Sequence, residues 1–451
     1  MSAALRTRAQ RKRSEQDGPR TMNPGQVTHN MPSWLRATAL WLMVALAPAA
    51  AQRLLVPMDG TQTDHLRAYG LTYWCLQEPR VYECEWLLNY RCGSFLLPDR
   101  AEVRARAAEM GVSVEAASDA DAQRVFATIE ASNMQRIHLS KAPKVAVYTP
   151  AYTEPWDDAV TLALTYAQID YDKVWDREVI RGELQEYEWL HLHHEDFTGN
   201  YGKFFSSFAN EPWYRRQVIE SRQAAEDLGF ADVQACKKAV AAAIARWVAQ
   251  GKFLFAMCCA ADTLDIALAA QGVDIVCAPV DGTAMDPAAQ DKLDFRPTMA
   301  FKDFRLVMDP MDPEIADIDV SPGPTHMVSQ GEVFQLFEFS AKQDPIPTML
   351  TQCHVGEVPD FLGQTTAFRR ECLKASAVVM GDFLGAGKVK YLHGNYLEGT
   401  FTFLGGHDPE DYAHIIGEPA TDLALHRHSP GYRLILNNIL FPAAKTKERK
   451  T

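Results

Sequence analysis

Three short segments of this sequence place reactive side chains directly after apolar runs. The runs "EWLHL", "KFLFAM" and "GTFTFLGG" are followed in turn by His193, His194, Glu195 and Asp196, by Cys258, and by His407. Unpaired ionisable groups are costly to bury, so we expect these side chains at strand ends, in a crevice or on a surface. Thiol, imidazole and carboxylate groups can carry out nucleophilic or acid–base catalysis, or bind a metal ion.

Cys258 has the flanking residues that a nucleophile on a sharp strand-to-helix turn requires. Such a turn needs small residues two positions before and after the nucleophile, and Ala256 and Ala260 occupy these positions. At a helix start, backbone N–H groups and the helix dipole would stabilise the thiolate. The alternative is a small buried residue without chemistry, which is the usual role of a free cysteine. We expect the neighbouring Cys259 to point away from the crevice.

The histidines and Glu195 offer a second chemistry, because imidazole and carboxylate groups are ligands of zinc and iron. Adjacent strand residues point to opposite faces, so at most two of His193, His194 and Glu195 can bind one ion, and His407 could supply a third ligand. No fixed-spacing ligand motif supports a metal site, so we assign no metal ligand and keep a divalent metal as an alternative. A further alternative is that Asp196 caps the following turn and His194 bonds a carbonyl group.

Other residues are predicted to line the same crevice. Trp156 and Asp157 follow a strand, and Gly199 lets the backbone approach a ligand because it has no Cβ. We assign Trp156, Asp157 and Gly199 to substrate binding, together with the His/Glu/Asp run at 193–196. His191 is instead predicted to be a hydrogen-bonded core histidine, because leucines bracket it within the strand.

The elements that must position these residues follow an alternating pattern. Apolar runs such as "KVAVY", "EWLHL" and "KFLFAM" alternate with helical patterns, which is typical of α/β architecture. One helix is expected from Thr153 as N-cap, and another from Asp262 and Thr263. In an open parallel sheet, ligands bind beyond the carboxyl ends of the strands. We therefore expect the three reactive segments to converge there.

The chain divides into several predicted segments. Its 451 residues suit two domains, or one large domain with insertions. The segments are a leader and signal peptide (1–51), an N-terminal α/β unit (52–140), a main domain (141–445) with a β-rich insertion at about 288–370, and a disordered tail (446–451).

The N-terminal segment predicts export to the periplasm or the extracellular space. "MPSWLRATALWLMVALAPAAAQ" has a basic residue, an apolar run and an A-x-A cleavage site, and is too short to span a membrane. We expect no stable membrane anchor after cleavage. The net charge of −13 makes nucleic acid an unsuitable partner, because binding phosphates needs a basic face. Nine cysteines leave at least one thiol unpaired, while Cys75, Cys84 and Cys92 are close enough to contain one disulfide.

The C-terminal segment resembles a known family. "YLEGTFTFLGGHDPEDY" followed by "SPGYRLILNNILFPA" is similar to the end of trehalose-utilisation (ThuA-like) domains. Those domains share the class I glutamine amidotransferase-like fold, a flavodoxin-like open parallel sheet. With "HLHHEDFTG", "LFAMC" and "GGHDPEDY", nearly the whole mature chain also resembles a secreted bacterial family often labelled "asparagine synthetase B". The resemblance implies a fold of this type.

The resemblance also implies catalytic roles. In the amidotransferases the elbow carries the catalytic Cys, here Cys258, and a His of an H-P-E string activates it, here His407 with Glu410. This sequence departs from that pattern, with H-D-P-E and with Ala at both elbow positions. Asparagine synthesis is not supported, because residue 2 is Ser and the S-G-G-x-D-S pyrophosphatase loop does not occur.

Two functions follow from these observations. The first is a secreted hydrolase with Cys258 as nucleophile, His407 as proton shuttle and backbone N–H groups near Gly199 and the elbow as oxyanion donors, acting on a small or carbohydrate-derived substrate. The second is a non-catalytic protein that binds a carbohydrate or a metal, with Trp156 and Trp189 stacking on a sugar. The oligomeric state stays open.

Overall fold

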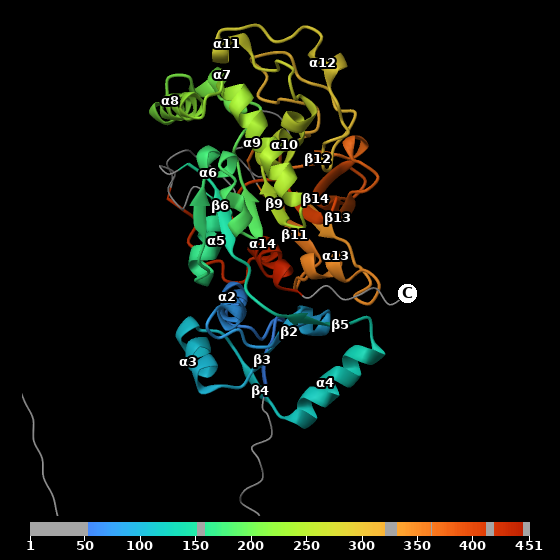
Figure 1. Cartoon of the computed structure of the whole chain (residues 1–451). Coiled ribbons are helices and arrows are strands. Elements are labelled where there is room, and N and C mark those ends of the chain that lie inside the picture. Colours follow the sequence, from blue (N-terminus) through green and yellow to red (C-terminus); the bar gives the residue numbers. More distant parts are fainter. Residues whose placement is uncertain (1–52, 151–157, 321–331, 362, 412–418, 445–451) are drawn as a thin grey trace, which may run out of the picture. The chain divides into compact units, whose positions relative to one another are not determined.

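The computed structural model describes residues 53–150, 158–320, 332–361, 363–411 and 419–444, which are coloured in Figure 1. All of them belong to one compact unit, Ala51–Thr451. The predicted leader and the C-terminal tail lie outside the described residues. Trp156 and Asp157 also lie outside them.

A sheet with a parallel core organises the described part of the chain. Its five parallel strands are adjacent in the order β7-β6-β8-β9-β15. Their bounds are β6 (Val145–Tyr148), β7 (Asp172–Val174), β8 (Trp189–Leu192), β9 (Phe253–Met257) and β15 (Gly399–Leu404). Numbered along the chain, this order is 2-1-3-4-5, which is the flavodoxin-like order. The predicted α/β class with parallel core strands is confirmed.

Antiparallel strands extend this sheet beyond β15. The order continues through β14, β13, β10 and β11, and β12 pairs with β14, which gives ten strands among the described residues. Their bounds are β10 (Val333–Leu336), β11 (Glu357–Pro359), β12 (Phe368–Arg369), β13 (Val378–Phe383) and β14 (Lys388–Tyr396). Among the described residues of the expected insertion, regular strands begin at Val333, and β13 and β14 continue the β-rich part past residue 370. These strands hydrogen-bond into the central sheet.

A separate antiparallel sheet precedes the central one. Its strand order is β4-β1-β3-β2-β5 within the described residues. The strands are β1 (Arg53–Val56), β2 (Cys84–Leu88), β3 (Ser94–Pro98), β4 (Glu115–Ala117) and β5 (Gln135–Leu139). Helices α2 (His65–Leu76), α3 (Ala101–Met110) and α4 (Asp119–Ala131) alternate with them. Helices and strands therefore alternate along this segment as predicted, although its sheet is antiparallel.

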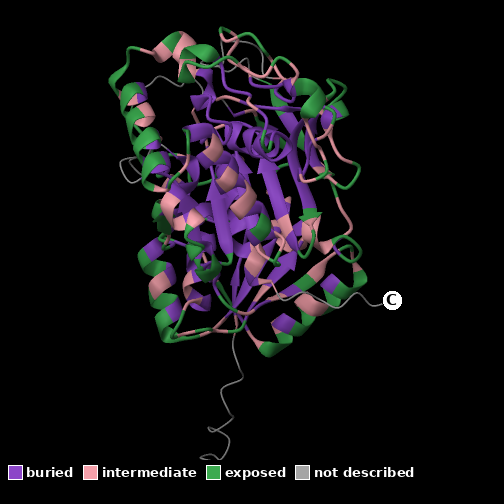
Figure 2. Cartoon of the chain, turned by 45° about the horizontal axis from the view of Figure 1, so that its top comes forward, coloured by how far each residue is buried: buried purple, intermediate pink, exposed green. Residues whose placement is uncertain are grey.

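Helices cover both faces of the parallel core, whose strands β6, β8 and β9 are fully buried (Figure 2). Helices α5 (Ala159–Ala167) and α14 (Pro430–Leu440) share one hydrophobic core with Trp189 of β8. Helices α9 (Val233–Val248) and α10 (Cys259–Ala269) share another with Leu190 and Leu192. Successive strand residues point to opposite faces, so β8 divides its side chains between the two cores. The remaining helices are α6 (Asp176–Ile180), α7 (Phe205–Phe208), α8 (Pro212–Asp227), α11 (Ala278–Asp281), α12 (Ala289–Lys292) and α13 (Pro345–Leu350).

Two helices begin where the sequence pattern did not place them. Helix α5 starts at Ala159, and Asp158 is its N-cap, accepting hydrogen bonds from the N–H groups of Val160 at 2.6 Å and Thr161 at 3.0 Å. Thr153, the expected N-cap, lies outside the described residues. Helix α10 starts at Cys259, three residues before the expected position. Small residues after the turn at Cys258 let the helix begin at once.

All nine cysteines are free thiols, so the disulfide considered among Cys75, Cys84 and Cys92 is not formed. Cys75 and Cys84 are fully buried in the core that α2 and β2 share. Among the described residues, no helix is both long enough and apolar enough to cross a bilayer.

One buried histidine makes the stability depend on pH. His393 of β14 is 4% exposed, and burial lowers its pKa to about 4. Its side chain lies 3.2 Å from the Thr402 hydroxyl. Between about pH 4 and pH 6.5 the unfolded chain binds a proton here that the folded chain does not, so this residue makes stability rise with pH.

We predict that His393→Gln flattens that rise. The free energy of unfolding, measured with urea from pH 4.5 to 6.5, should lose a slope of up to about 1.4 kcal/mol per pH unit relative to the wild type. Parallel pH curves for the two proteins would show that His393 does not titrate differently in the folded and unfolded states.

Candidate functional site

The register of the parallel strands brings the reactive segments to one edge. Leu192 of β8 pairs with Ala256 of β9, and Met257 of β9 pairs with Leu404 of β15. The residues that follow these strands therefore leave the sheet side by side. Two backbone hydrogen bonds join them: Cys258 N–H to the Leu404 carbonyl at 3.3 Å, and Ala260 N–H to the His193 carbonyl at 3.0 Å.

Cys258 occupies a sharp turn between β9 and α10. Its φ of 53° and ψ of −145° place a residue with a Cβ in a conformation that costs of order 1–3 kcal/mol. Ala256 and Ala260 are fully buried around the turn. The thiol is 1% exposed and donates a hydrogen bond to the Gln364 carbonyl at 2.9 Å. This is the strand–turn–helix context expected for a nucleophile elbow.

The pKa of the Cys258 thiol is lowered overall. Burial alone would raise it, but hydrogen bonds from Cys259 and the positive charge of His193 outweigh burial. The backbone N–H of Cys259 is among the groups that bond the Cys258 sulfur. The thiol of Cys259 also lies 2.9 Å from the His194 carbonyl, to which it can donate.

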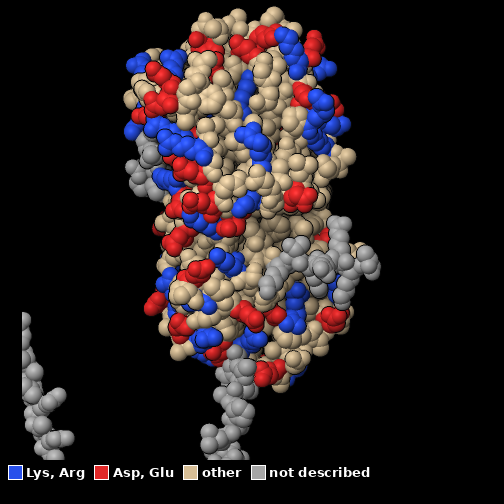
Figure 3. All heavy atoms as spheres, in the orientation of Figure 1, with Lys and Arg blue, Asp and Glu red and all other residues tan. Residues whose placement is uncertain are grey.

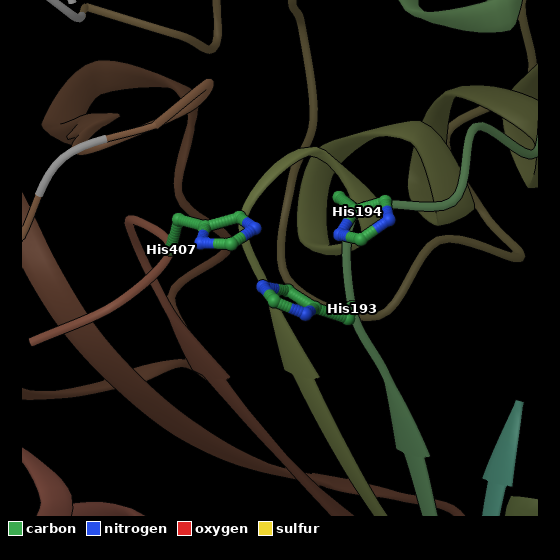
Figure 4. A group of neighbouring side chains, drawn as sticks. All are labelled: His193, His194 and His407. Atoms are coloured by element: carbon green, nitrogen blue, oxygen red, sulfur yellow. The ribbon is translucent and has the colours of Figure 1, made fainter. Parts of the chain in front are cut away.

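Three histidine rings gather at the same edge (Figure 4). The ring centroids of His193 and His407 are 4.3 Å apart, those of His193 and His194 are 4.6 Å apart, and those of His194 and His407 are 5.5 Å apart. One nitrogen from each ring lies within 4.8 Å of the other two. Two neighbouring histidines can face one space because β8 ends at Leu192, so the alternation of a strand no longer applies.

The Asp158 carboxylate contacts two histidines near the carboxyl edge of the parallel strands. Its Oδ2 accepts a hydrogen bond from His191 Nε2 at 3.1 Å and makes an ion-pair contact of 3.0 Å with His193 Nδ1. Burial would raise the pKa of this carboxyl, but His193 and His191 hold it well below its usual range. For His193, burial lowers the pKa while Asp158 raises it, and the net pKa is raised.

One ring nitrogen of His193 is available for a hydrogen bond or a ligand. The side chain is 2% exposed, and its Nε2 has no hydrogen-bond partner within the described residues. The opposite nitrogen, Nδ1, faces Asp158. His191 is fully buried, as predicted for a core histidine, and its other nitrogen lies 3.2 Å from the Phe255 carbonyl.

The predicted ligand residues after His194 shape the loop itself. Asp196 accepts hydrogen bonds from the Thr198 N–H at 2.6 Å and hydroxyl at 2.6 Å, and from the Gly202 N–H at 2.8 Å, so it caps this turn. Burial raises the pKa of Glu195 to about 7, although the charge of Lys237 opposes that rise. Gly199 packs against Gln234 of α9.

His407 lies next to Cys258, and Glu410 pairs with a histidine further along the chain. A Cβ on Gly363 would stand 2.6 Å from His407 Cβ and 3.5 Å from Cys258 Sγ, so these two side chains share one small space. Glu410 instead makes an ion pair with His426, with Glu410 Oε2 and His426 Nδ1 3.1 Å apart. Trp189, considered as a stacking ring, is fully buried and donates to the Asn438 carbonyl at 3.1 Å, so it cannot meet a sugar.

Sequence reasoning missed Asp158 and Gly363. Asp158 has no place among the predicted site residues, because an acid before a helix is ordinarily explained by the helix dipole. The available signal was its place at a helix start after a strand, on the edge where His193 was expected. No local pattern marks Gly363, because its role comes from contact with two residues distant in sequence.

Comparisons with known proteins found similar solved structures but no matching family. No family model and no curated protein matches it. Solved structures similar to it include a Salmonella typhimurium cytoplasmic protein, STM3548, at 10% identity with a TM-score of 0.33. Another is STM1381 from Salmonella typhimurium LT2, at 14% identity with a TM-score of 0.32. Each match covers 67% of this chain and 100% of the other. At these scores we draw no conclusion about function from them.

Gly363 provides a test of the packing at the edge. Gly363→Ala should lower the free energy of unfolding by about 1–3 kcal/mol, because its φ of +119° disfavours a side chain and the Cβ would clash with His407. The matched control is Gly356→Ala, whose Cβ meets nothing within 4 Å; it should change stability by less than about 0.5 kcal/mol. Equal urea midpoints for the two variants would contradict the contact.

Proposed function

We propose that this protein is a hydrolase of acyl bonds with Cys258 as its nucleophile and His193 as its acid–base group. One observation carries the proposal: the thiol stands on a strained strand-to-helix turn, at the edge where the buried Nε2 of His193 has no hydrogen-bond partner among the described residues. His193 replaces the expected His407 and Glu410 pair in this role. His193 has a buried carboxylate beside it, whereas Glu410 contacts His426.

The chemistry follows the order of a thiol hydrolase. The Cys258 proton passes to His193 Nε2 as the sulfur attacks the carbonyl carbon of an ester or amide. The N–H of Cys259, the residue after the nucleophile, bonds the Cys258 sulfur and passes to the oxyanion once the sulfur has attacked. His193 returns the proton to the departing alcohol or amine. A water molecule then cleaves the thioester, with His193 as its base.

Asp158 supports these reaction steps by orienting His193. Its carboxylate faces Nδ1 of His193, which directs the proton-accepting lone pair to Nε2 and stabilises the imidazolium that forms. Because the carboxylate is buried and caps α5, it holds the ring without competition from water.

The substrate class in this proposal is a small or carbohydrate-derived ester or amide, met after export. The signal-like segment supports export, and the net charge of −13 speaks against a nucleic-acid substrate. The second candidate is a non-catalytic binding protein of the same fold. The 1% exposure of the Cys258 thiol and its bond to the Gln364 carbonyl favour this candidate.

We expect Cys258→Ala and His193→Gln each to lower kcat/KM for p-nitrophenyl acetate by at least about 10³-fold, since each removes a group that the chemistry needs. Cys353→Ser, which alters a half-buried thiol elsewhere, is the matched control and should keep wild-type turnover. Circular dichroism would verify that the variants fold. Full turnover by folded Cys258→Ala would exclude the thiol mechanism and leave the binding protein.

A further inference from the structure

We propose that His193, His194 and His407 form a binding site for one divalent transition-metal ion of the zinc class, and that a bound ion blocks the thiol chemistry. The metal site stands on its own geometry. Only the blocking effect rests on the proposed function.

The convergence of three ring nitrogens carries the first part. They come from two segments that are far apart in sequence and lie within 4.8 Å of one another. Figure 4 shows the three rings turned toward one shared space. A tetrahedral zinc ion with ligands at about 2.1 Å holds them about 3.4 Å apart. Rotation of the half-buried His194 and His407 rings can shorten the separations from within 4.8 Å to about 3.4 Å.

His193 has the arrangement that a metal ligand requires. Its Nε2 is buried without a partner within the described residues, while Nδ1 faces the Asp158 carboxylate at 3.0 Å. Ligating histidines almost always direct their second nitrogen to a carboxylate, a carbonyl group or water, which fixes the tautomer. Asp158 is therefore a positioning residue for the ligand.

The ligand set selects the class of ion. Three imidazoles suit zinc, iron, cobalt or copper, whereas calcium and magnesium require oxygen ligands. The carboxylates of the loop do not belong to this cluster: Asp196 caps its own turn, and the Glu195 side chain is not among the groups within 4.8 Å. Three protein ligands leave the fourth position of a tetrahedral ion for water or another small ligand.

The blocking effect follows from a single lone pair. An ion on His193 Nε2 uses the electrons that would accept the Cys258 proton. While the ion is bound, the thiol has no base, and the hydrolysis proposed above cannot start. Metal loading and thiol hydrolysis therefore exclude each other at this residue.

Binding is tested on the full chain after dialysis against EDTA and then against buffer without it. Zinc chloride titrated by calorimetry should bind at one ion per chain. His194→Ala and His407→Ala should each weaken binding at least tenfold, and Asp158→Asn should weaken it about 10–100-fold. His428→Gln, which alters a histidine paired with His65 elsewhere, is the matched control and should bind as the wild type does. Absence of saturable binding, or wild-type affinity in both alanine variants, would overturn the site.

Hydrolysis of p-nitrophenyl acetate tests the blocking effect separately. Zinc should inhibit the wild type with the midpoint found by calorimetry, and EDTA should restore turnover. If zinc binds at the three histidines but is required for turnover, the blocking effect is wrong and the site stands. If zinc binds and Cys258→Ala keeps full turnover, the proposed function fails and the site again stands. If Cys258→Ala is inactive and zinc does not bind, only the metal site fails.

Discussion

The buried carboxylate of Asp158 is the interaction on which the rest of the site depends. Its Oδ1 caps the first turn of α5, and its Oδ2 faces His191 and His193 of β8 and its end. A buried charge is costly unless it is paired and hydrogen-bonded. The start of a helix, the end of a strand and the orientation of two rings are thus fixed by one group.

A second constraint is the close approach of the backbone at Gly405 to the backbone at Thr366, next to the carboxyl edge of the parallel strands. A Cβ on Gly405 would stand 2.3 Å from the Thr366 carbonyl oxygen, so the segment around 363–366 lies directly on the turn before His407. The buried ammonium of Lys390 ties the same region together, with the Asp360 carboxylate at 2.5 Å and the Thr366 carbonyl at 2.9 Å. These contacts place His407 beside Cys258.

The charged side chains on the face of the molecule seen in Figure 3 are of both signs. Basic and acidic side chains alternate over the face seen in Figure 3. The Cys258 thiol and the cluster of His193, His194 and His407 lie together at the carboxyl edge of the parallel strands. A single nitrogen there, Nε2 of His193, can serve proton transfer or a metal ion, and not both at once.

The sequence by itself determined the fold class and the edge at which reactive groups meet. Apolar runs alternating with helical patterns specify a parallel core, and parallel strands bring their carboxyl ends to one side, so His193, Cys258 and His407 had to come near one another. The small flanks of Cys258 likewise indicated its turn before any contact was known.

Only the tertiary structure decided the partners of each group. No local pattern indicated that Asp158 faces His193, or that Glu410 pairs with His426. Trp189 looked available for a ligand and is buried under α14. Periodicity describes one strand or helix at a time, whereas these pairings join segments far apart in the chain. They depend on packing distances that no local pattern contains.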